Sequence, residues 1–246
     1  MSFIDDVLIY SRTFEDHLRD LREFFQRLRQ HHVSLKPAKC DFFAQRAPYL
    51  GFVLTRQGIE PIAAKVEAIV KIPPPKKLTQ LRSFVQMVNF YRRFLKNMSV
   101  VAKPMTDLLR KEAGPFKGWA EDSAAQEAFL QVKKMLTSAP LLRHARSDLP
   151  FIIEVDASKD GFSAVLSQDF PKEDVEAELD VANVKRPTIR LPVHYASRKT
   201  RGGEPNYAPS HLEACAVLWG LDFFRHYHHG RPTTVLTDHG PLKWLV

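Results

Sequence analysis

Residues 151–170 read FIIEVDASKDGFSAVLSQDF, and this stretch decides the fold of the C-terminal part of the chain. It contains two apolar runs, 151–156 and 162–166, separated by a short polar segment. Such a pattern is typical of two strands joined by a tight turn. A third run at 193–197 continues the pattern, so the sequence predicts a meander of three strands.

A long helix and a further strand follow the meander. The helix is predicted over 209–228, and the strand covers 233–238. Strands followed by a helix and another strand favour an α/β fold in which helices cover a mixed sheet. The acidic stretch 169–180, between the second and third strands, is expected to form a mobile excursion. The apolar residues at helical spacing in the long helix are Leu212, Cys215, Ala216, Trp219 and Phe223.

The first sixty residues mix strand and helix patterns. Residues 3–10 predict a hairpin with Asp5 and Asp6 near its tip, and the spacing of apolar residues from Phe14 to Leu28 predicts a helix. The run 49–54 is typical of a strand in which Gly51 allows close approach of another backbone segment.

The next fifty residues are predicted to be helical. Pro61 suits the first turn of a helix, and the prolines at 73–75 must end that helix. Thr79 is a candidate cap for a basic helix, and a further helix is expected from Ser123 to Leu136, after a joint at 113–115. The apolar stripe of the basic helix is Leu81, Phe84, Val85, Val88 and Tyr91. Its cations are Arg82, Arg92, Arg93 and Lys96.

Charge is distributed unevenly along the chain. Residues 1–112 carry 20 Lys+Arg against 11 Asp+Glu, a net charge of +9, whereas residues 113–246 carry 16 against 17, a net charge of −1. A basic half favours nucleic acid as a partner, with a solvated basic surface as the alternative. No apolar run is long enough to span a bilayer, so a membrane partner is not expected. The two cysteines, Cys40 and Cys215, lack metal-ligand spacing and are expected to be buried or half-buried.

Two sets of carboxylates are candidates for two-metal chemistry, which needs several acids around a pair of hard ions. Asp5 and Asp6 lie between apolar residues, where unpaired charge is costly. Asp156 ends one strand, Glu213 lies near the start of the long helix, and Asp238 ends another strand. Taken alone, both sets also fit acids that merely form or cap turns.

An ordered series of motifs resembles the Pol polyprotein of gypsy-type LTR retrotransposons. Phe3-Ile4-Asp5-Asp6 is similar to the Tyr-x-Asp-Asp hairpin of retroelement reverse transcriptases, with Phe3 in place of the usual tyrosine. The further motifs are, in chain order, 17–18, 35–40, 49–52, 73–75, 81–84, 89–94, 136–140, 155–158, 161, 164–167, 195–199 and 237–239.

The resemblance implies four segments: a palm remnant at 1–60, a thumb at 61–112, a connection at 113–148 and an RNase-H-like domain at 149–246. The fold is then α/β, with a truncated reverse-transcriptase palm and thumb followed by an incomplete RNase-H-like mixed sheet with flanking helices. Residues 49–52, which include Tyr49 and Gly51, are similar to the primer grip. The cations implied to contact nucleic acid are Lys76, Lys77, Arg82, Arg92, Arg93 and Lys96.

The resemblance also implies the function of the two acid sets. Asp5 and Asp6 match polymerase carboxylates, and Asp156, Glu213 and Asp238 match RNase H carboxylates; both sets would bind Mg²⁺ or Mn²⁺. The family's third polymerase acid and fourth RNase H acid have no counterpart in the chain. We therefore expect that the chain alone does not extend a primer, and that its first ten residues are poorly ordered or packed differently from the family.

The predicted function is RNA-directed DNA synthesis coupled to cleavage of the RNA strand of RNA–DNA hybrids. The partners are template–primer or hybrid and other parts of the polyprotein, in an intracellular setting for which the family suggests cytoplasmic particles and the nucleus. The alternative is a catalytically inactive nucleic-acid-binding remnant of a decayed element. His211, where relatives often carry glutamate, and the histidines at 31–32, 226 and 228–229 are expected at the surface rather than on a metal.

Overall fold

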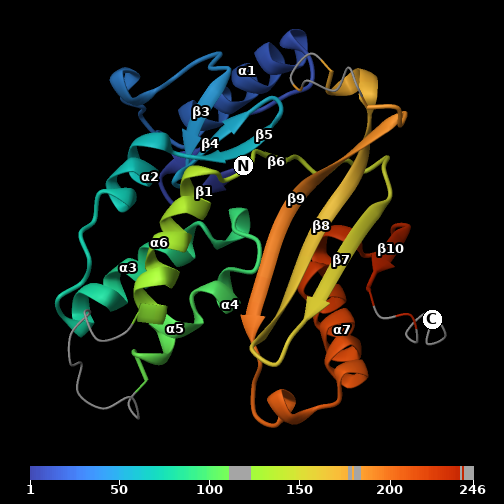
Figure 1. Cartoon of the computed structure of the whole chain (residues 1–246). Helices are drawn as coiled ribbons and strands as arrows, with labels where there is room; N and C mark the ends of the chain where they lie inside the picture. Colours follow the sequence, from blue (N-terminus) through green and yellow to red (C-terminus); the bar gives the residue numbers. More distant parts are fainter. Residues whose placement is uncertain (111–122, 177–178, 180–183, 239, 241–246) are drawn as a thin grey trace. The chain divides into compact units, whose positions relative to one another are not determined.

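The computed structural model describes residues 1–110, 123–176, 179, 184–238 and 240 (Figure 1). The chain divides into two compact units, Met1–Arg56 and Gln57–Val246, and each is described by itself. In the part of the chain that the structure describes, every helix is too short or too polar to cross a membrane.

The first unit opens with the predicted hairpin. Strands β1 (Ser2–Phe3) and β2 (Asp6–Val7) pair antiparallel, so that Phe3 lies opposite Asp6 and the turn contains Ile4 and Asp5. Ile4 has φ 51° and is 84% exposed, an unusual backbone conformation for a β-branched residue. The hairpin is the whole of its sheet among the described residues, and Phe3 and Val7 are exposed. The apolar side chains of Phe3 and Val7 are therefore largely uncovered.

Helix α1 (Phe14–Gln30) forms where the apolar spacing predicts it. The Thr13 hydroxyl caps the helix by accepting a hydrogen bond from the Asp16 amide at 3.1 Å. Only Leu21 of this helix is buried, so most of the apolar stripe is half-exposed.

The prediction of a single strand at 49–54 is wrong, because the structure has a hairpin there. Strands β3 (Arg46–Tyr49) and β4 (Phe52–Thr55) pair antiparallel, and Tyr49 lies opposite Phe52. Leu50 and Gly51 form the two-residue turn with φ 48° and φ 84°. Positive φ at both positions is typical of the tight turns that match strand twist, so Gly51 serves the turn rather than a close backbone approach.

The second unit begins with a short strand and a set of helices. Strand β5 (Gly58–Pro61) pairs with β6 (Leu142–Arg143), and helix α6 (Ser123–Thr137) contacts α2, α4 and α5. The rings of Phe84 and Phe129 lie 4.4 Å apart and join the helices in one apolar core. The remaining helices are α2 (Ala63–Val70), α3 (Leu78–Phe90), α4 (Met98–Val101) and α5 (Lys103–Asp107).

Three details of this helical region differ from the prediction. Pro61 ends β5 instead of starting a helix, and α2 begins at Ala63. Thr79 lies inside α3, whose cap position is Lys77. The basic residues do not share one helix, because α3 ends at Phe90 and a separate 3₁₀ turn, η2 (Arg92–Phe94), follows. The apolar stripe of α3 and Tyr91 is buried as predicted.

The mixed sheet of the C-terminal part is confirmed. Strands β7 (Phe151–Ala157), β8 (Gly161–Pro171) and β9 (Thr188–Lys199) form the antiparallel meander. Strand β10 (Thr233–Leu236) is parallel to β7, which gives the order β10-β7-β8-β9 (Figure 1). Helix α7 (Pro209–His228) has the predicted bounds.

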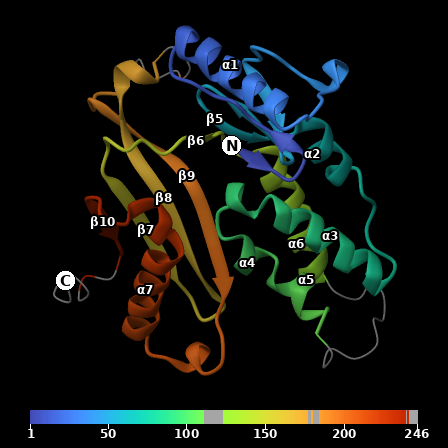
Figure 2. The same ribbon diagram turned by 180° about the vertical axis from the view of Figure 1, so that it is seen from behind.

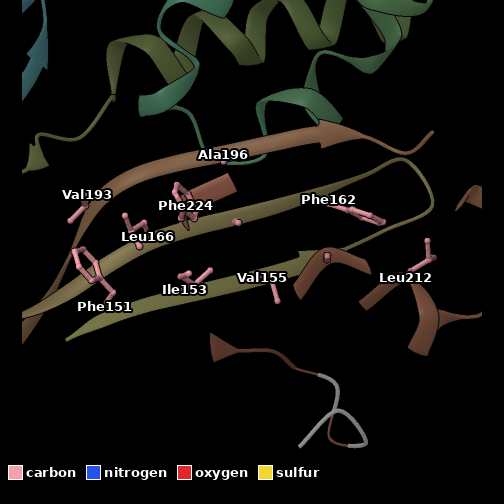
Figure 3. Packing of buried hydrophobic residues seen from close by; sticks show 11 residues of the cluster. Phe151, Ile153, Val155, Phe162, Leu166, Val193, Ala196, Leu212 and Phe224 are labelled. Atoms are coloured by element: carbon pink, nitrogen blue, oxygen red, sulfur yellow. The ribbon is translucent and has the colours of Figure 1, made fainter. Parts of the chain in front are cut away.

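Helix α7 crosses one face of this sheet (Figure 2). The residues between them form the main core cluster, in which Phe151, Ile153, Phe162 and Phe224 are fully or almost fully buried (Figure 3). Gly220 lets the helix approach closely, because a Cβ placed there would lie 3.0 Å from Val155 Cγ1. Such a distance is tighter than ordinary packing, so the Val155 side chain packs directly against the helix backbone at Gly220.

The prediction of a mobile acidic excursion is wrong for its first part. Asp169 belongs to β8 and accepts from Arg190 Nε of β9 at 2.9 Å, and Asp174 in the 3₁₀ turn η5 (Lys172–Asp174) pairs with Arg146 at 2.5 Å. Cross-strand charge pairing extends the meander beyond the predicted strand end. Residues 177–178 and 180 of the excursion lie outside the described residues.

The segment from η2 to α5 contacts the edge strand β9 through polar groups. Ser99 of α4 donates its hydroxyl to the Ser197 carbonyl at 2.9 Å, and the Ser99 amide donates to Ser197 Oγ at 2.9 Å. The Arg92 guanidinium also donates to the Ser197 carbonyl. Lys199 Nζ reaches Asp107 Oδ1 of α5 at 2.8 Å. The two bonds to the Ser197 carbonyl cover a backbone group that an edge strand would otherwise expose.

Candidate active site

The register of the parallel pair β7–β10 brings two predicted site residues to neighbouring positions. Thr233 is aligned with Phe151 and Leu236 with Glu154, where the pairing ends; the same register, if continued by two residues beyond β10, would bring Asp238 level with Asp156. Asp156 lies in β7, Asp238 lies just beyond β10, and both side chains are exposed. Neighbouring strands are about 4.8 Å apart, so carboxylates at matching strand ends can share a ligand.

The third predicted acid, Glu213, approaches the same region from α7. It lies in the second turn of the helix and is 8% exposed, which is unusual for a carboxylate. The Thr237 hydroxyl donates to Glu213 Oε2 at 3.5 Å, so the Glu213 side chain reaches the residue next to Asp238. Glu213 therefore contacts the segment that follows β10, the strand paired with the one that contains Asp156.

These residues suit a hard divalent cation chemically, because Mg²⁺ and Mn²⁺ prefer carboxylate oxygens. Among the described residues, however, no three His, Cys, Asp or Glu side chains are placed close enough to hold an ion as they stand. To complete a site, the exposed Asp156 and Asp238 side chains would have to turn toward Glu213.

The other acid pair lies in the first unit. Asp5 occupies the turn of the β1–β2 hairpin and Asp6 starts β2, as the sequence predicts, and both side chains are exposed. The burial of charge that made this pair notable in the sequence does not occur in the structure.

The residues expected to contact nucleic acid occupy different environments. Tyr49 ends β3 and is 9% exposed, and Gly51 lies in the adjoining turn. Arg92 already donates to the Ser197 carbonyl, and burial lowers the pKa of its guanidinium. Arg93 is half-buried. Arg92 as a whole residue is exposed, and so are the remaining cations of this set: Lys76, Lys77, Arg82 and Lys96.

The histidine and cysteine predictions agree with the structure where it tests them. His211 is exposed on α7, and Cys40 and Cys215 are half-buried thiols without a disulfide. His194, which the sequence analysis did not single out, lies among the aromatic rings of Phe223, Phe224 and Tyr227. Burial there lowers its pKa to about 3, with nearby Arg93 adding to the effect.

Sequence comparison identifies the class of protein that this fold and these acids represent. Residues 1–54 match the reverse transcriptase (RNA-dependent DNA polymerase) family, and residues 146–246 match the RNase H-like domain found in reverse transcriptase. The chain therefore carries part of a reverse transcriptase joined to an RNase H-like domain.

Relatives make the likeness more specific, because along nearly its whole length the chain is similar to retrotransposon Pol polyproteins. It is 32% identical to the retrovirus-related Pol polyprotein from transposon 297 of Drosophila melanogaster over 99% of this chain, and 28% identical to that from transposon gypsy over 99%. It spans 21% and 22% of the lengths of these two relatives. The transposon Tf2-3 polyprotein of Schizosaccharomyces pombe is 28% identical over 98% of this chain and is covered to 17%.

Solved structures support the fold. A foamy viral protease-reverse transcriptase in complex with dsDNA has a TM-score of 0.75 at 19% identity, covering 96% of this chain and 45% of that one. The same kind of protein in complex with RNA/DNA hybrid has a TM-score of 0.72 at 19% identity, covering 95% of this chain and 30% of that one. At this level of identity the likeness concerns the fold alone.

Proposed function

We propose that the chain serves reverse transcription and that its C-terminal domain cleaves the RNA strand of RNA–DNA hybrids with divalent metal. The observation that carries the proposal is the parallel pairing of β7, which contains Asp156, with β10, which leads to Asp238, together with the contact of Thr237 with Glu213. The family match of residues 146–246 supports it. The cytoplasmic-particle and nuclear setting that the family implies is part of the same proposal.

Asp156, Glu213 and Asp238 would hold Mg²⁺ or Mn²⁺, which when bound activates water and stabilises the leaving oxygen of a phosphodiester. The chain's own contribution is placement. Strand β7 holds the main chain of Asp156, Asp238 follows β10 by two residues, and the Thr237 hydroxyl donates to Glu213. Because Glu213 is shielded from water, its interaction with a cation would be stronger than that of an exposed carboxylate.

For the first unit, we propose that Asp5 and Asp6 act as polymerase carboxylates and that Tyr49 and Gly51 lie near the primer. The support is the β1–β2 hairpin, which has Asp5 in its turn and Asp6 at the start of β2, and the family match of residues 1–54. The exposed cations at Lys76, Lys77 and Arg82 would neutralise phosphates of template–primer. The domain limits 1–60, 61–112, 113–148 and 149–246 belong to this proposal.

The test is Mn²⁺ binding measured by calorimetry, together with cleavage of a labelled RNA–DNA hybrid. We expect Asp156→Asn to weaken Mn²⁺ binding at least tenfold and to abolish any cleavage, because it removes a charged ligand. Asp169→Asn is a matched control, since Asp169 lies in the same sheet and pairs with Arg190 instead. An unchanged heat of binding in Asp156→Asn would refute the metal site. Hybrid binding without metal binding would instead support the inactive nucleic-acid-binding remnant.

A further inference from the structure

An ion pair joins the end of β9 to the segment that leads into α7. Arg198 donates to both carboxylate oxygens of Glu204, at 2.7 Å from Nη1 and 2.9 Å from Nη2. Glu204 lies in the 3₁₀ turn η6 (Glu204–Asn206) and also accepts from the Arg201 amide at 2.7 Å. The two paired side chains are only 15% and 18% exposed. Two parallel bonds fix the direction of both side chains as well as their distance.

The same guanidinium is held between aromatic rings of the sheet and the helix. Its central carbon lies 4.4 Å from the ring centroid of Phe162 in β8 and 5.6 Å from that of Trp219 in α7. Arg198 therefore contacts β8, η6 and α7 while belonging to β9. Stacking of a guanidinium on aromatic rings adds attraction that a lysine would not reproduce at this site.

The turn held by this pair leads directly into the helix that carries Glu213. Tyr207 donates its amide to the Glu204 carbonyl at 3.0 Å, and the helix starts two residues later, at Pro209. The amides of His211 and Leu212 bond to the Ala208 carbonyl and close the first turn. The connecting segment lies at the end of the sheet where β9 terminates (Figure 1). The covalent route from β9 to Glu213 thus passes through η6.

The first turn of α7 has no side-chain cap of its own. Its cap position is Ala208, which offers no hydroxyl or carboxylate to the amides at the helix start. Helix starts without such a cap open readily, so the position of the first turn depends on packing and on the segment before it. Leu212, 4% exposed, supplies the packing, and the Arg198–Glu204 pair restrains the preceding segment.

We propose that Arg198 and Glu204 are positioning residues that hold the first turn of α7, and with it the Glu213 carboxylate, beside Thr237. Their importance for metal binding rests on the proposed function, but their effect on the helix start does not. Burial of both partners favours a well-defined geometry, and the hydrogen bonds from Arg198 lower the pKa of Glu204, so that the pair stays charged across the neutral range.

The experiment compares Arg198→Met, Glu204→Gln and the unmodified chain. Amide hydrogen exchange of residues 211–213 reports on the first turn, and Mn²⁺ calorimetry reports on the acids. We expect exchange of these amides to rise at least tenfold in both variants, while the amides of residues 220–228 change little. Mn²⁺ affinity should fall by about threefold to tenfold, and Arg198→Lys should restore only part of either property, because it keeps the charge but loses the paired bonds.

Arg190→Met is the matched control. Arg190 lies on the same strand and pairs with Asp169 and Glu154, but it is eight residues from Arg198, about 27 Å along an extended strand. It should leave exchange at residues 211–213 unchanged. Unchanged exchange in Arg198→Met would overturn the proposal, as would faster exchange of equal size throughout α7.

The two proposals fail in different ways. If exchange at 211–213 rises but Asp156→Asn leaves Mn²⁺ binding unaltered in the otherwise unmodified chain, the positioning role stands and the metal site is refuted. If Asp156→Asn weakens Mn²⁺ binding while Arg198→Met does not, the metal site stands and the link from Arg198 to Glu213 is overturned.

Discussion

At the scale of single residues, a few side chains owe their properties to surroundings far away in the sequence. His194 is the clearest case, because its neighbours come from the C-terminal half of α7, about thirty residues later. Its Nδ1 lies 3.4 Å from the Tyr227 hydroxyl, and three aromatic rings surround it. A histidine in such a place stays neutral, since burial disfavours the charged form.

This environment predicts a pH dependence of stability. The pKa of His194 is about 3 in the fold against 6.5 in an unfolded chain, so between these values only the unfolded state takes up the proton. The free energy of unfolding should therefore fall as the pH drops from about 6.5, by up to about 1.4 kcal/mol per pH unit. Denaturation curves recorded between pH 5 and 7 give the free energy of unfolding at each pH. In His194→Gln this free energy should change less with pH, while His211→Gln, at an exposed site, should keep the dependence of the unmodified chain. Equal slopes in all three proteins would contradict the assignment.

Gly220 gives a second prediction at this scale. A Cβ there would meet Val155 Cγ1 at 3.0 Å and Ala164 Cβ at 3.4 Å. Overpacking costs about 1–3 kcal/mol, whereas replacing a helical glycine by alanine gains up to about 1 kcal/mol. Gly220→Ala should therefore be nearly neutral and Gly220→Val destabilising by about 2–3 kcal/mol. Leu218→Val, on the exposed side of the same helix, controls for helix propensity, and a similar loss there would contradict the packing argument.

At the scale of elements, the contact between α4 and the edge of β9 depends on a pair of serines. Ser197 is 2% exposed. Its hydroxyl accepts from the Ser99 amide, and its carbonyl accepts from the Ser99 hydroxyl. A helix of four residues cannot hold its place by propensity alone, so these bonds and the neighbouring apolar contacts must fix it.

We expect Ser197→Ala to destabilise the second unit more than Ser99→Ala does. Removing the Ser197 hydroxyl leaves the Ser99 amide without its acceptor, which costs about 1–3 kcal/mol, whereas removing the Ser99 hydroxyl loses about 1 kcal/mol. Urea denaturation of both single variants and the double variant would measure the difference and the coupling. Additive effects of equal size would show that the two serines do not act together.

At the scale of the whole molecule, the basic residues of 1–112 are of two kinds. Some are exposed to a nucleic-acid partner, and others donate hydrogen bonds within the chain. Arg92 is exposed, but its guanidinium donates to the Ser197 carbonyl; Lys76, Lys77 and Arg82 are exposed near the start of α3. Binding of template–primer through phosphates should therefore depend on this exposed group rather than on the single basic helix that the sequence predicts.

Replacing Lys76, Lys77 and Arg82 by glutamine should flatten the plot of log K against log salt by about 0.9 for each phosphate that is no longer neutralised. The same change at Arg22, Arg27 and Arg29 alters the net charge equally on the exposed face of α1 and should flatten it much less. Filter binding of a labelled duplex over a range of salt would measure both slopes. Equal flattening would mean that net charge, and not this group, drives binding.

The amino-acid sequence alone determined the elements with a strong local signal. Helix α7, the strand meander and the Asp5-Asp6 hairpin follow from apolar periodicity and turn chemistry, which act over a few residues. Motif order gave the acid set Asp156, Glu213 and Asp238. The local pattern predicted one strand at 49–54, and this was wrong. The apolar run there contains a two-residue turn, in which Leu50 and Gly51 both have positive φ.

Only the tertiary structure decided which of these residues meet. Strand β10, which leads to Asp238, pairs in parallel with β7, which contains Asp156, and the Thr237 hydroxyl reaches Glu213. The Arg198–Glu204 pair, the shielded His194 and the use of Arg92 by Ser197 also depend on chain segments that fold onto each other. Register, burial and side-chain partners are set by contacts between distant segments, and no local pattern of residues encodes them.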